Sequence, residues 1–576
     1  MAIRVAPSAG FCMGVKRAVD LVLDLARKKG GEKIFTYGPL IHNPQTVELL
    51  KRRGIIAINN EKELENLPKG ALIVIRAHGI PPAERNRLKE RGLKIVDATC
   101  PRVGKVQGII KKYALRDYLV VIAGDKAHPE VVGLLGYAGN NGLVIERLED
   151  VETIPVDRPI CVVSQTTQNH EKYESLVAAI KARFPEAIVF DTICDSTERR
   201  QKEVEELARD MDATVIVGGR NSANTRHLAT LAARAGKPVY HVETASELPL
   251  NQLKRAENIG ISAGASTPNW IIERVIEAIS SHRPHRRSLA HFFFSLWTWA
   301  IKTDVYSSLG AGLLTWMACA LEGIELSFFP FLIAATYVFS MHTINRFIDR
   351  EASTIIGSFR EEVYLRRQRL LLFAAVLSLL VSVSFSALLG YPTLILILVL
   401  LAGGLLYTIR LFPPRWKFRS FRDIPGSKNM VMATAWALVT AVIPSLAGET
   451  SFLRALIAAL FVAGLVFLRS IISDLQDIQS DKFIGRETIP VLIGQKYTTY
   501  VINIVSLTLL LLLWISYLAT WMPALSLFLS PIIFYLWICN RLYVRKPQFS
   551  GLIKEGLLET AYYVAGMITF AWMVWS

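Results

Sequence analysis

The sequence predicts a soluble α/β domain built from three similar units, followed by an all-α polytopic membrane domain of about nine transmembrane helices. Two observations predict the first part: a cysteine motif recurs at nearly equal separations, and successive strands end in polar residues. A third observation predicts the second part, because long apolar segments broken by basic loops begin at about residue 303. We therefore expect a first domain at 1–281, a basic and aromatic linker at 282–302 and a membrane domain at 303–576.

The recurring motif places a cysteine between a strand and a helix. Cys12, Cys100 and Cys194 each follow a short apolar run and precede a basic segment. A helix N-terminus and nearby Lys and Arg lower the pKa of a thiol, so these positions favour thiolates. Three converging thiolates fit an iron–sulfur cluster or a metal ion, and three buried apolar cysteines are the alternative. Because a closed site takes four ligands, three cysteines would leave one metal position open for a substrate.

Six further strands are predicted to end in polar residues that can bind an anion. Ligands of α/β sheets lie beyond the carboxyl ends of strands, where histidines, hydroxyl groups and glycine-lined turns suit a phosphate or diphosphate. A lone histidine at a strand end is more often structural, so only the whole set indicates a binding site. The predicted strands are 34–37, 71–75, 118–122, 159–163, 213–217 and 259–262, and the residues that follow them include His42, His78, His128, Thr166, Ser222 and Ser266.

The composition limits the classes of protein that fit. The chain has 576 residues, is 52% hydrophobic and carries a formal net charge of +16. Much of that charge falls in loops between apolar segments and no aromatic-basic motif is found, so we expect no nucleic-acid partner. Six cysteines without a regular framework, and no visible signal peptide, predict a reducing cytoplasm. Cys161, Cys319 and Cys539 are expected to be structural.

Five segments of the first domain, among them Gly10-Phe11-Cys12-Met13-Gly14-Val15 and Asp97-Ala98-Thr99-Cys100-Pro101, resemble a known family, 4-hydroxy-3-methylbut-2-enyl diphosphate reductase (the IspH/LytB family). The resemblance covers residues 1 to about 280, nearly the whole family length. It implies a trefoil-like, pseudo-symmetric arrangement of three α/β units around a [4Fe–4S] cluster with one open iron. The segments are Gly10-Phe11-Cys12-Met13-Gly14-Val15, Asp97-Ala98-Thr99-Cys100-Pro101, His128-Pro129-Glu130-Val131, Ser164-Gln165-Thr166-Thr167 and Gly264-Ala265-Ser266.

The same resemblance implies a role for each matched residue. Cys12, Cys100 and Cys194 would hold the cluster, and Glu130 would supply protons near the substrate hydroxyl with help from Thr166. The implied reaction is reductive dehydroxylation of (E)-4-hydroxy-3-methylbut-2-enyl diphosphate to isopentenyl and dimethylallyl diphosphate, with ferredoxin or flavodoxin as electron donor. The residues that would hold the substrate diphosphate are His42, His78, His128, Ser222, Asn224 and Ser266.

The first domain departs from the family at one position, and a second activity is possible for it. Where the family often has Ser-Ser-Asn, this chain has Ser222-Ala223-Asn224, so one hydroxyl for the diphosphate is missing. The alternative for the first domain is a different cluster-dependent hydro-lyase, which would turn over its substrate without an electron donor.

The second domain is predicted to cross a membrane. Its basic loops all fall on one side under a count of nine spans, and the positive-inside rule then places that side and the first domain in the cytoplasm, at the cytoplasmic (inner) membrane. The linker contains His, Arg, Phe and Trp residues that indicate an interfacial helix, with a solvated linker as the alternative. The nine predicted spans are 304–322, 326–346, 370–390, 393–411, 429–447, 452–473, 499–519, 523–541 and 558–575.

Carboxylates and amides lie at span ends on the basic side. Carboxylates three or four residues apart share a helical face, and such oxygen clusters hold Mg²⁺ through a substrate diphosphate; acidic helix caps are the alternative. Asn-x-x-x-Asp and Asp-x-x-Asp-x-x-x-Asp ahead of Gly-x-x-Thr-x-Pro resemble the UbiA superfamily of membrane prenyltransferases, which have nine helices. That resemblance implies Mg²⁺, a prenyl diphosphate and a lipid or aromatic acceptor. The residues concerned are Asn345, Asp349, Asp474, Asp477 and Asp481, with Tyr407, Lys417 and Arg422 as looser matches.

The chain is therefore interpreted as a fusion of a reductase with a membrane prenyltransferase. The first UbiA-like motif ends in Ser353 where the family usually has Asp, so a catalytically silent membrane anchor is the alternative for the second domain. Channelling between the two halves is not assumed, because chain elongation normally separates the two reactions.

Overall fold

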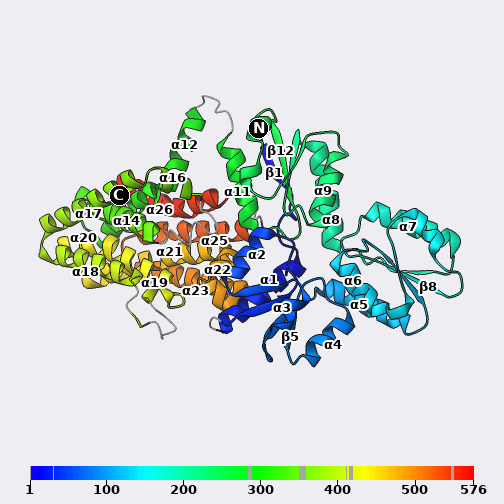
Figure 1. Ribbon diagram of the computed structural model, residues 1–576. Coiled ribbons are helices and arrows are strands. Elements are labelled where there is room, and N and C mark those ends of the chain that lie inside the picture. Colours follow the sequence, from blue (N-terminus) through cyan, green and yellow to red (C-terminus); the bar gives the residue numbers. More distant parts are fainter. Residues whose placement is uncertain are drawn as a thin grey trace. The chain divides into compact units, whose positions relative to one another are not determined.

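The computed structural model divides into two compact units, Met1–Pro284 and His285–Ser576, and each is described by itself (Figure 1). The first unit is α/β and the second is helical, as the sequence predicts. The structure describes residues 2–29, 32–282, 289–348, 359–409, 412–413, 420–545 and 550–575.

Three four-stranded sheets with all strands parallel form the frame of the first unit. Their strand orders are β3-β2-β4-β5, β7-β6-β8-β9 and β11-β10-β12-β1. Each sheet thus has its second strand at one edge, followed by the first, third and fourth, which confirms the three-unit prediction. The strands are β1 Ala2–Val5, β2 Ile34–Tyr37, β3 Ile55–Ile58, β4 Leu72–Ile75, β5 Lys94–Asp97, β6 Leu119–Ala123, β7 Gly142–Ile145, β8 Ile160–Ser164, β9 Ile188–Val189, β10 Ala213–Val217, β11 Val239–Val242 and β12 Asn258–Ala263.

The third sheet is completed by the start of the chain. Its fourth strand is β1, which pairs in parallel with β12 from Ala2 opposite Asn258 to Val5 opposite Ile261. Consequently, the first cysteine motif belongs to the same repeat position as the second and third, although it lies at the other end of the sequence.

Helices cover both faces of these sheets, so the central strands are apolar throughout. All five residues of β6 and of β8 are buried, as expected for parallel strands covered on both faces. The helices of the first unit are α1 Met13–Lys28, α2 Pro44–Arg52, α3 Glu61–Glu65, α4 Pro82–Glu90, α5 Pro101–Ala114, α6 Pro129–Ala138, α7 His170–Arg183, α8 Asp195–Asp210, α9 Ala223–Ala233, α10 Leu250–Leu253 and α11 Asn269–Ser281.

The second unit has seven described helices that are long and apolar enough to cross a membrane. Helices also occupy the two other predicted spans, Val305–Glu322 and Tyr391–Thr408, but the count of nine crossings stays a prediction. The helices are α12 Leu289–Lys302, α13 Val305–Glu322, α14 Phe328–Ile348, α16 Glu361–Arg366, α17 Gln368–Leu389, α18 Tyr391–Thr408, α19 Ser427–Ala437, α20 Ile443–Ala447, α21 Phe452–Gln476, α22 Ile478–Ile484, α23 Ile489–Leu518, α24 Leu525–Phe528, α25 Ser530–Arg545 and α26 Gly551–Trp575.

The aromatic part of the linker forms helix α12. Phe292, Phe293, Phe294 and Trp299 on this helix are exposed, which suits an interfacial helix. Its position at a membrane surface stays a prediction.

Candidate active site

Each of the three predicted cysteines lies between the fourth strand of a unit and the helix that follows. Cys12 is the N-cap of α1, Cys100 of α5 and Cys194 of α8. The Cys12 sulfur accepts a hydrogen bond from the backbone N–H of Val15 at 3.4 Å. Helix N-termini stabilise negative charge, so each thiolate has a polar environment prepared by the backbone.

The three thiols lie together at the centre of the first unit. A Cβ atom added to Gly14 would lie 2.6 Å from the sulfur of Cys100 and 4.0 Å from that of Cys12. Buried Arg200 ties this centre to the third sheet, because its guanidinium donates to the carbonyls of Gly10 at 2.7 Å and Ala263 at 2.9 Å. Charge on Cys12 or Cys194 acts on Cys100, so the three sulfurs form one group.

The donor type of these three residues fits an iron–sulfur cluster. Cysteine thiolates are the ligands that hold [4Fe–4S] clusters, so the donor set fits that group. The histidines form a separate group, because the ligand atoms of His42, His78 and His128 all lie within 4.8 Å of one another.

The expected lowering of thiol pKa is wrong for Cys100. Burial raises the pKa of the Cys100 thiol, and the opposing hydrogen bonds from the backbone N–H groups of Arg102 and Val103 do not outweigh it. Desolvation of the charged form is therefore the larger effect at this position. The charge of bound irons would act in the opposite direction.

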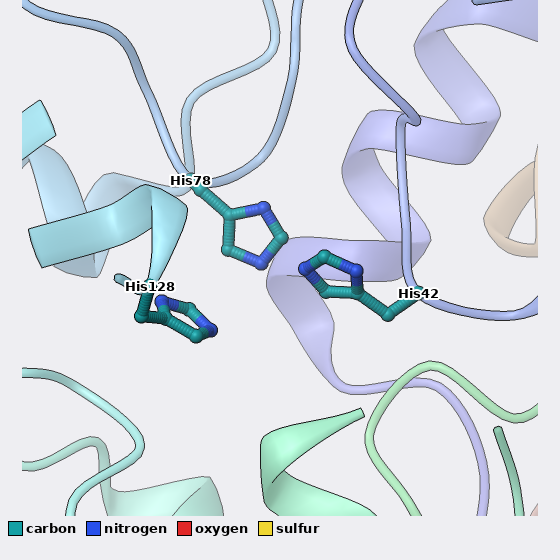
Figure 2. A group of neighbouring side chains, drawn as sticks. All are labelled: His42, His78 and His128. Carbon is teal, nitrogen blue, oxygen red and sulfur yellow. The ribbon is translucent and has the colours of Figure 1, made fainter. Parts of the chain in front are cut away.

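Three histidines from three different loops meet beside this centre (Figure 2). His42 follows β2, His78 follows β4, and His128 follows β6 as the N-cap of α6. Their ring centroids are 4.8 Å apart for His42 and His78, 5.5 Å for His78 and His128, and 6.0 Å for His42 and His128. The three histidines that the sequence analysis selected therefore lie together in the fold.

Two of the three histidines have a buried ring nitrogen without a hydrogen-bond partner in the described part of the chain, and a bound anion could be that partner. Burial lowers the pKa of all three side chains, to about 4 for His128. The Nδ1 atom of His128 accepts from the backbone N–H of Glu130 at 3.2 Å, which leaves Nε2 as the proton-bearing nitrogen of the neutral ring. Nε2 of His42 and Nδ1 of His78 are buried without a hydrogen-bond partner among the described residues. Buried polar atoms without a partner are costly, so these nitrogens indicate a polar ligand at this point.

The third sheet contributes the remaining polar residues of this site. Ser222 is the N-cap of α9, and its hydroxyl accepts from the backbone N–H of Thr225 at 3.3 Å. The Nδ2 atom of nearby Asn224 is buried and has no partner in the described structure. Ser266, after β12, donates to the carbonyl of His42 at 3.4 Å, which joins the third unit to the first.

Glu130 and Thr166 form a buried pair next to the histidines. The carboxylate of Glu130 accepts from the backbone N–H of Thr166 at 2.7 Å and from its hydroxyl at 2.9 Å. Burial nevertheless raises the pKa of Glu130 above its ordinary value. A carboxyl that keeps its proton to higher pH, held by a hydroxyl that can relay one, is equipped to donate protons.

The nine residues fall into three sets related by the repeat. The first strands of the units lead to His42, His128 and Ser222, and the third strands lead to His78, Thr166 and Ser266. The fourth strands lead to the cysteines, and ligands of parallel sheets bind beyond such strand ends. Each unit thus supplies three residues to a shared centre, one after its first strand, one after its third and one after its fourth.

Two basic residues of this centre were missed by the sequence analysis. Arg76, two residues before His78, is mostly buried, and its charge helps to lower the pKa of each histidine. Its position directly after β4 was a usable signal. Arg200 had none, because its partners Gly10 and Ala263 are distant in sequence.

In the second unit three of the predicted carboxylates, Asp474, Asp477 and Asp481, lie where α21 ends and α22 begins. Asp474 is buried and accepts from the ammonium of Lys428 at 2.7 Å, a partner that the sequence analysis missed. Asp477 caps α21 and is exposed, and buried Asp481 accepts from the hydroxyl of Thr488 at 3.1 Å. These three carboxylates supply hard oxygen atoms of the kind that Mg²⁺ prefers.

The first motif of the second unit is only partly described. Asn345 lies near the end of α14, and its Oδ1 is buried without a hydrogen-bond partner among the described atoms. Neighbouring Arg346 forms two hydrogen bonds with fully buried Asp304, at 2.5 and 2.7 Å. Asp349, Ser353 and Lys417 lie outside the described residues.

The first unit therefore has the features of one class of protein: a three-sheet α/β fold with three cysteines whose thiols could hold a cluster, beside a histidine group that could bind an anion. Residues 3–280 match the family model described as LytB protein, and residues 305–550 match the one described as UbiA prenyltransferase family.

Relatives of known name agree with the match of the first half. The 4-hydroxy-3-methylbut-2-enyl diphosphate reductase of Caldanaerobacter subterraneus subsp. tengcongensis is 40% identical over 281 residues, which cover 49% of this chain and 97% of the relative. The enzyme of the same name from Aquifex aeolicus is 43% identical over 276 residues, 47% of this chain and 94% of the relative. A UbiA homolog from Archaeoglobus fulgidus, solved with GPP and Mg²⁺, covers 48% of this chain and 99% of its own at 17% identity and a TM-score of 0.36. The chain belongs to the LytB family through its first half, and its second half is a UbiA-family domain.

Proposed function

We propose that the first domain, 1–281, catalyses the reductive dehydroxylation of (E)-4-hydroxy-3-methylbut-2-enyl diphosphate. The observation that carries this proposal is the three-fold set of thiolates, histidines and hydroxyl groups at strand ends around one centre. Two electrons and two protons remove the substrate hydroxyl as water and leave isopentenyl or dimethylallyl diphosphate. The balance requires an electron donor outside the chain.

The residues divide this work by their chemistry. Cys12, Cys100 and Cys194 would hold a [4Fe–4S] cluster, which supplies electrons and a Lewis-acidic position for the leaving hydroxyl. The diphosphate would accept hydrogen bonds from His42, His78, His128, Ser222, Asn224 and Ser266.

Proton delivery is assigned to Glu130. Its buried carboxyl holds a proton that Thr166 can orient or relay through its hydroxyl. Departure of the hydroxyl as water would consume this proton, and the carboxylate that remains keeps its two hydrogen bonds from Thr166 until it is reprotonated.

An anaerobic assay with a small reductant tests the proposal. Purified chain reconstituted with iron and sulfide is given the hydroxylated diphosphate and reduced methyl viologen, and dye oxidation and five-carbon products are measured together. Oxidation of the dye in step with product formation is the expected result. Turnover without any reductant would indicate a hydro-lyase instead, and an iron-free protein would contradict the cluster assignment.

We infer that the second domain, 303–576, is a Mg²⁺-dependent prenyltransferase that uses a prenyl diphosphate and a lipid or aromatic acceptor. Asn345, Asp349, Asp474, Asp477 and Asp481 are the proposed residues for Mg²⁺ and diphosphate. The clustering of Asp474, Asp477 and Asp481 within eight residues, from the end of α21 into α22, supports this role. Ser353 favours the second candidate, a silent membrane anchor.

Binding of a prenyl diphosphate distinguishes these candidates without knowledge of the acceptor. Detergent-solubilised chain is titrated with geranyl diphosphate with and without Mg²⁺, and the same is done for Asp477→Asn. A prenyltransferase should bind more tightly with Mg²⁺, and the variant should lose that gain. Absence of any Mg²⁺ effect in the native chain would support the anchor.

The placement of the protein is part of the same proposal. The UbiA-family domain and its apolar helices indicate a multi-pass membrane protein. We propose the cytoplasmic membrane, with the reductase domain on the cytoplasmic side, because the basic loops of the second domain are predicted on that side.

A further inference from the structure

The three helices that begin at the cysteines share a second feature, a ring of exposed cations. The fifth residue after each cysteine is Arg17 on α1, Lys105 on α5 and Arg199 on α8, and all three are exposed. Because an α-helix rises about 1.5 Å per residue, each cation is roughly 7 Å along the helix from its cysteine. The proposed function does not use these residues.

Two contacts place basic side chains of these helices beside the cysteines of neighbouring units. The guanidinium of Arg17 donates to the carbonyl of Thr99, the residue before Cys100, at 2.9 Å. On the next helix, Arg102 pairs with Asp195, the residue after Cys194. Basic side chains therefore bridge from one helix start to the next around the sulfurs.

The surface at these helix starts carries further exposed side chains, one basic and one apolar. Lys16 is exposed, and Met13, directly after Cys12, is 64% exposed. The acidic groups on these first turns are already used, because Asp195 pairs with Arg102 and Glu198 with Lys202. Cations remain in excess over the sulfur centre.

We propose that this basic surface, formed by Met13, Lys16, Arg17, Arg102, Lys105 and Arg199, is the docking site for an acidic one-electron carrier protein. Complementary charge steers diffusional encounter and sets orientation, and an exposed apolar side chain at the centre of a charged rim is a usual feature of protein interfaces. The carrier gives up one electron per encounter, so two encounters complete one turnover. This inference rests on the proposed reductase activity.

The test compares a small reductant with a protein donor on the same full-length chain. The variant Lys105→Glu/Arg199→Glu reverses two cations of the ring. The control, Lys111→Glu/Lys172→Glu, makes the same charge change at exposed positions further along α5 and on α7. Activity is measured with reduced methyl viologen and with a strongly acidic ferredoxin, and binding of oxidised ferredoxin is measured by calorimetry.

The expected pattern separates docking from chemistry. The ring variant should keep its viologen activity, while its KM and Kd for ferredoxin rise about tenfold or more, since rim charges act mainly on association. Added salt should weaken ferredoxin binding to the native chain, because exposed charges are screened. Equal behaviour of ring and control variants with ferredoxin would overturn the docking site alone, whereas a native chain inactive with viologen would overturn the reductase itself.

Discussion

Replacing Gly14 with alanine should impair cluster assembly while leaving the fold intact. The added Cβ would lie 2.6 Å from the sulfur of Cys100 and 3.1 Å from its Cβ, whereas atoms at optimal contact are about 3.5–4.0 Å apart. The Cys100 thiol must therefore move by about 1 Å, roughly twice the tolerance of about 0.5 Å for a preorganised site. Overpacking costs about 1–3 kcal/mol, and alanine returns about 1 kcal/mol of helix propensity, so the free energy of unfolding changes little.

Iron content and melting temperature, measured on the same preparation, check this reasoning. Gly14→Ala should bind several-fold less iron per chain than the native protein, with an iron-free melting temperature close to native. The matched control is Gly104→Ala on α5, where an added Cβ meets nothing within 4 Å; it should keep full iron. A Gly14→Ala protein with native iron content and a native absorption spectrum would refute the proposed packing of the thiols.

Three further perturbations follow from the site and the second unit. Glu130→Gln should abolish turnover yet fold, because Thr166 can still donate to the amide oxygen. Burial raises the pKa of Glu130 in the folded chain, so its stabilising contribution is complete below its ordinary pKa of 4.5 and is lost as pH rises through the folded value. Urea titrations should therefore show that the free energy of unfolding of the variant increases relative to that of the native chain as pH rises. Because His128 has a pKa depressed to about 4, inorganic diphosphate should bind with proton uptake below pH 7, seen by calorimetry in two buffers; the absence of uptake would contradict the anion site. Asp304→Asn leaves Arg346 without its buried partner and should cost the second unit about 3–5 kcal/mol, read as faster proteolysis in detergent with unchanged reductase activity.

The site residues that follow strands could be predicted from the sequence because two signals coincide there: an apolar run, which predicts the strand, and a polar residue directly after it. Cys100 and Cys194 are examples, and the apolar runs before them form the strands β5 and β9. The outer strands β3, β7 and β11 were missed, since no polar motif follows them and a short apolar run has no periodicity of its own.

Contacts between distant segments could not be predicted in the same way. Arg200 reaches Gly10 across 190 residues, and Lys428 reaches Asp474 across 46. No spacing rule connects such pairs. The pKa of Cys100 was predicted with the wrong sign for a related reason, because burial depends on the assembled fold while the helix N-terminus is visible in the sequence.

The pairing of β1 with β12 also sets an order of events during synthesis. Cys12 is made about 250 residues before the partner of its strand, because β1 pairs with β12, Asn258–Ala263. At about 5–20 residues per second this interval is on the order of ten to fifty seconds. The three-cysteine site can therefore form only after the whole first unit has been translated, at about the time that the first apolar helices of the second unit follow. Until then the strand before Cys12 has no partner in its sheet, which makes assembly of the three-cysteine site a late step in the maturation of this chain.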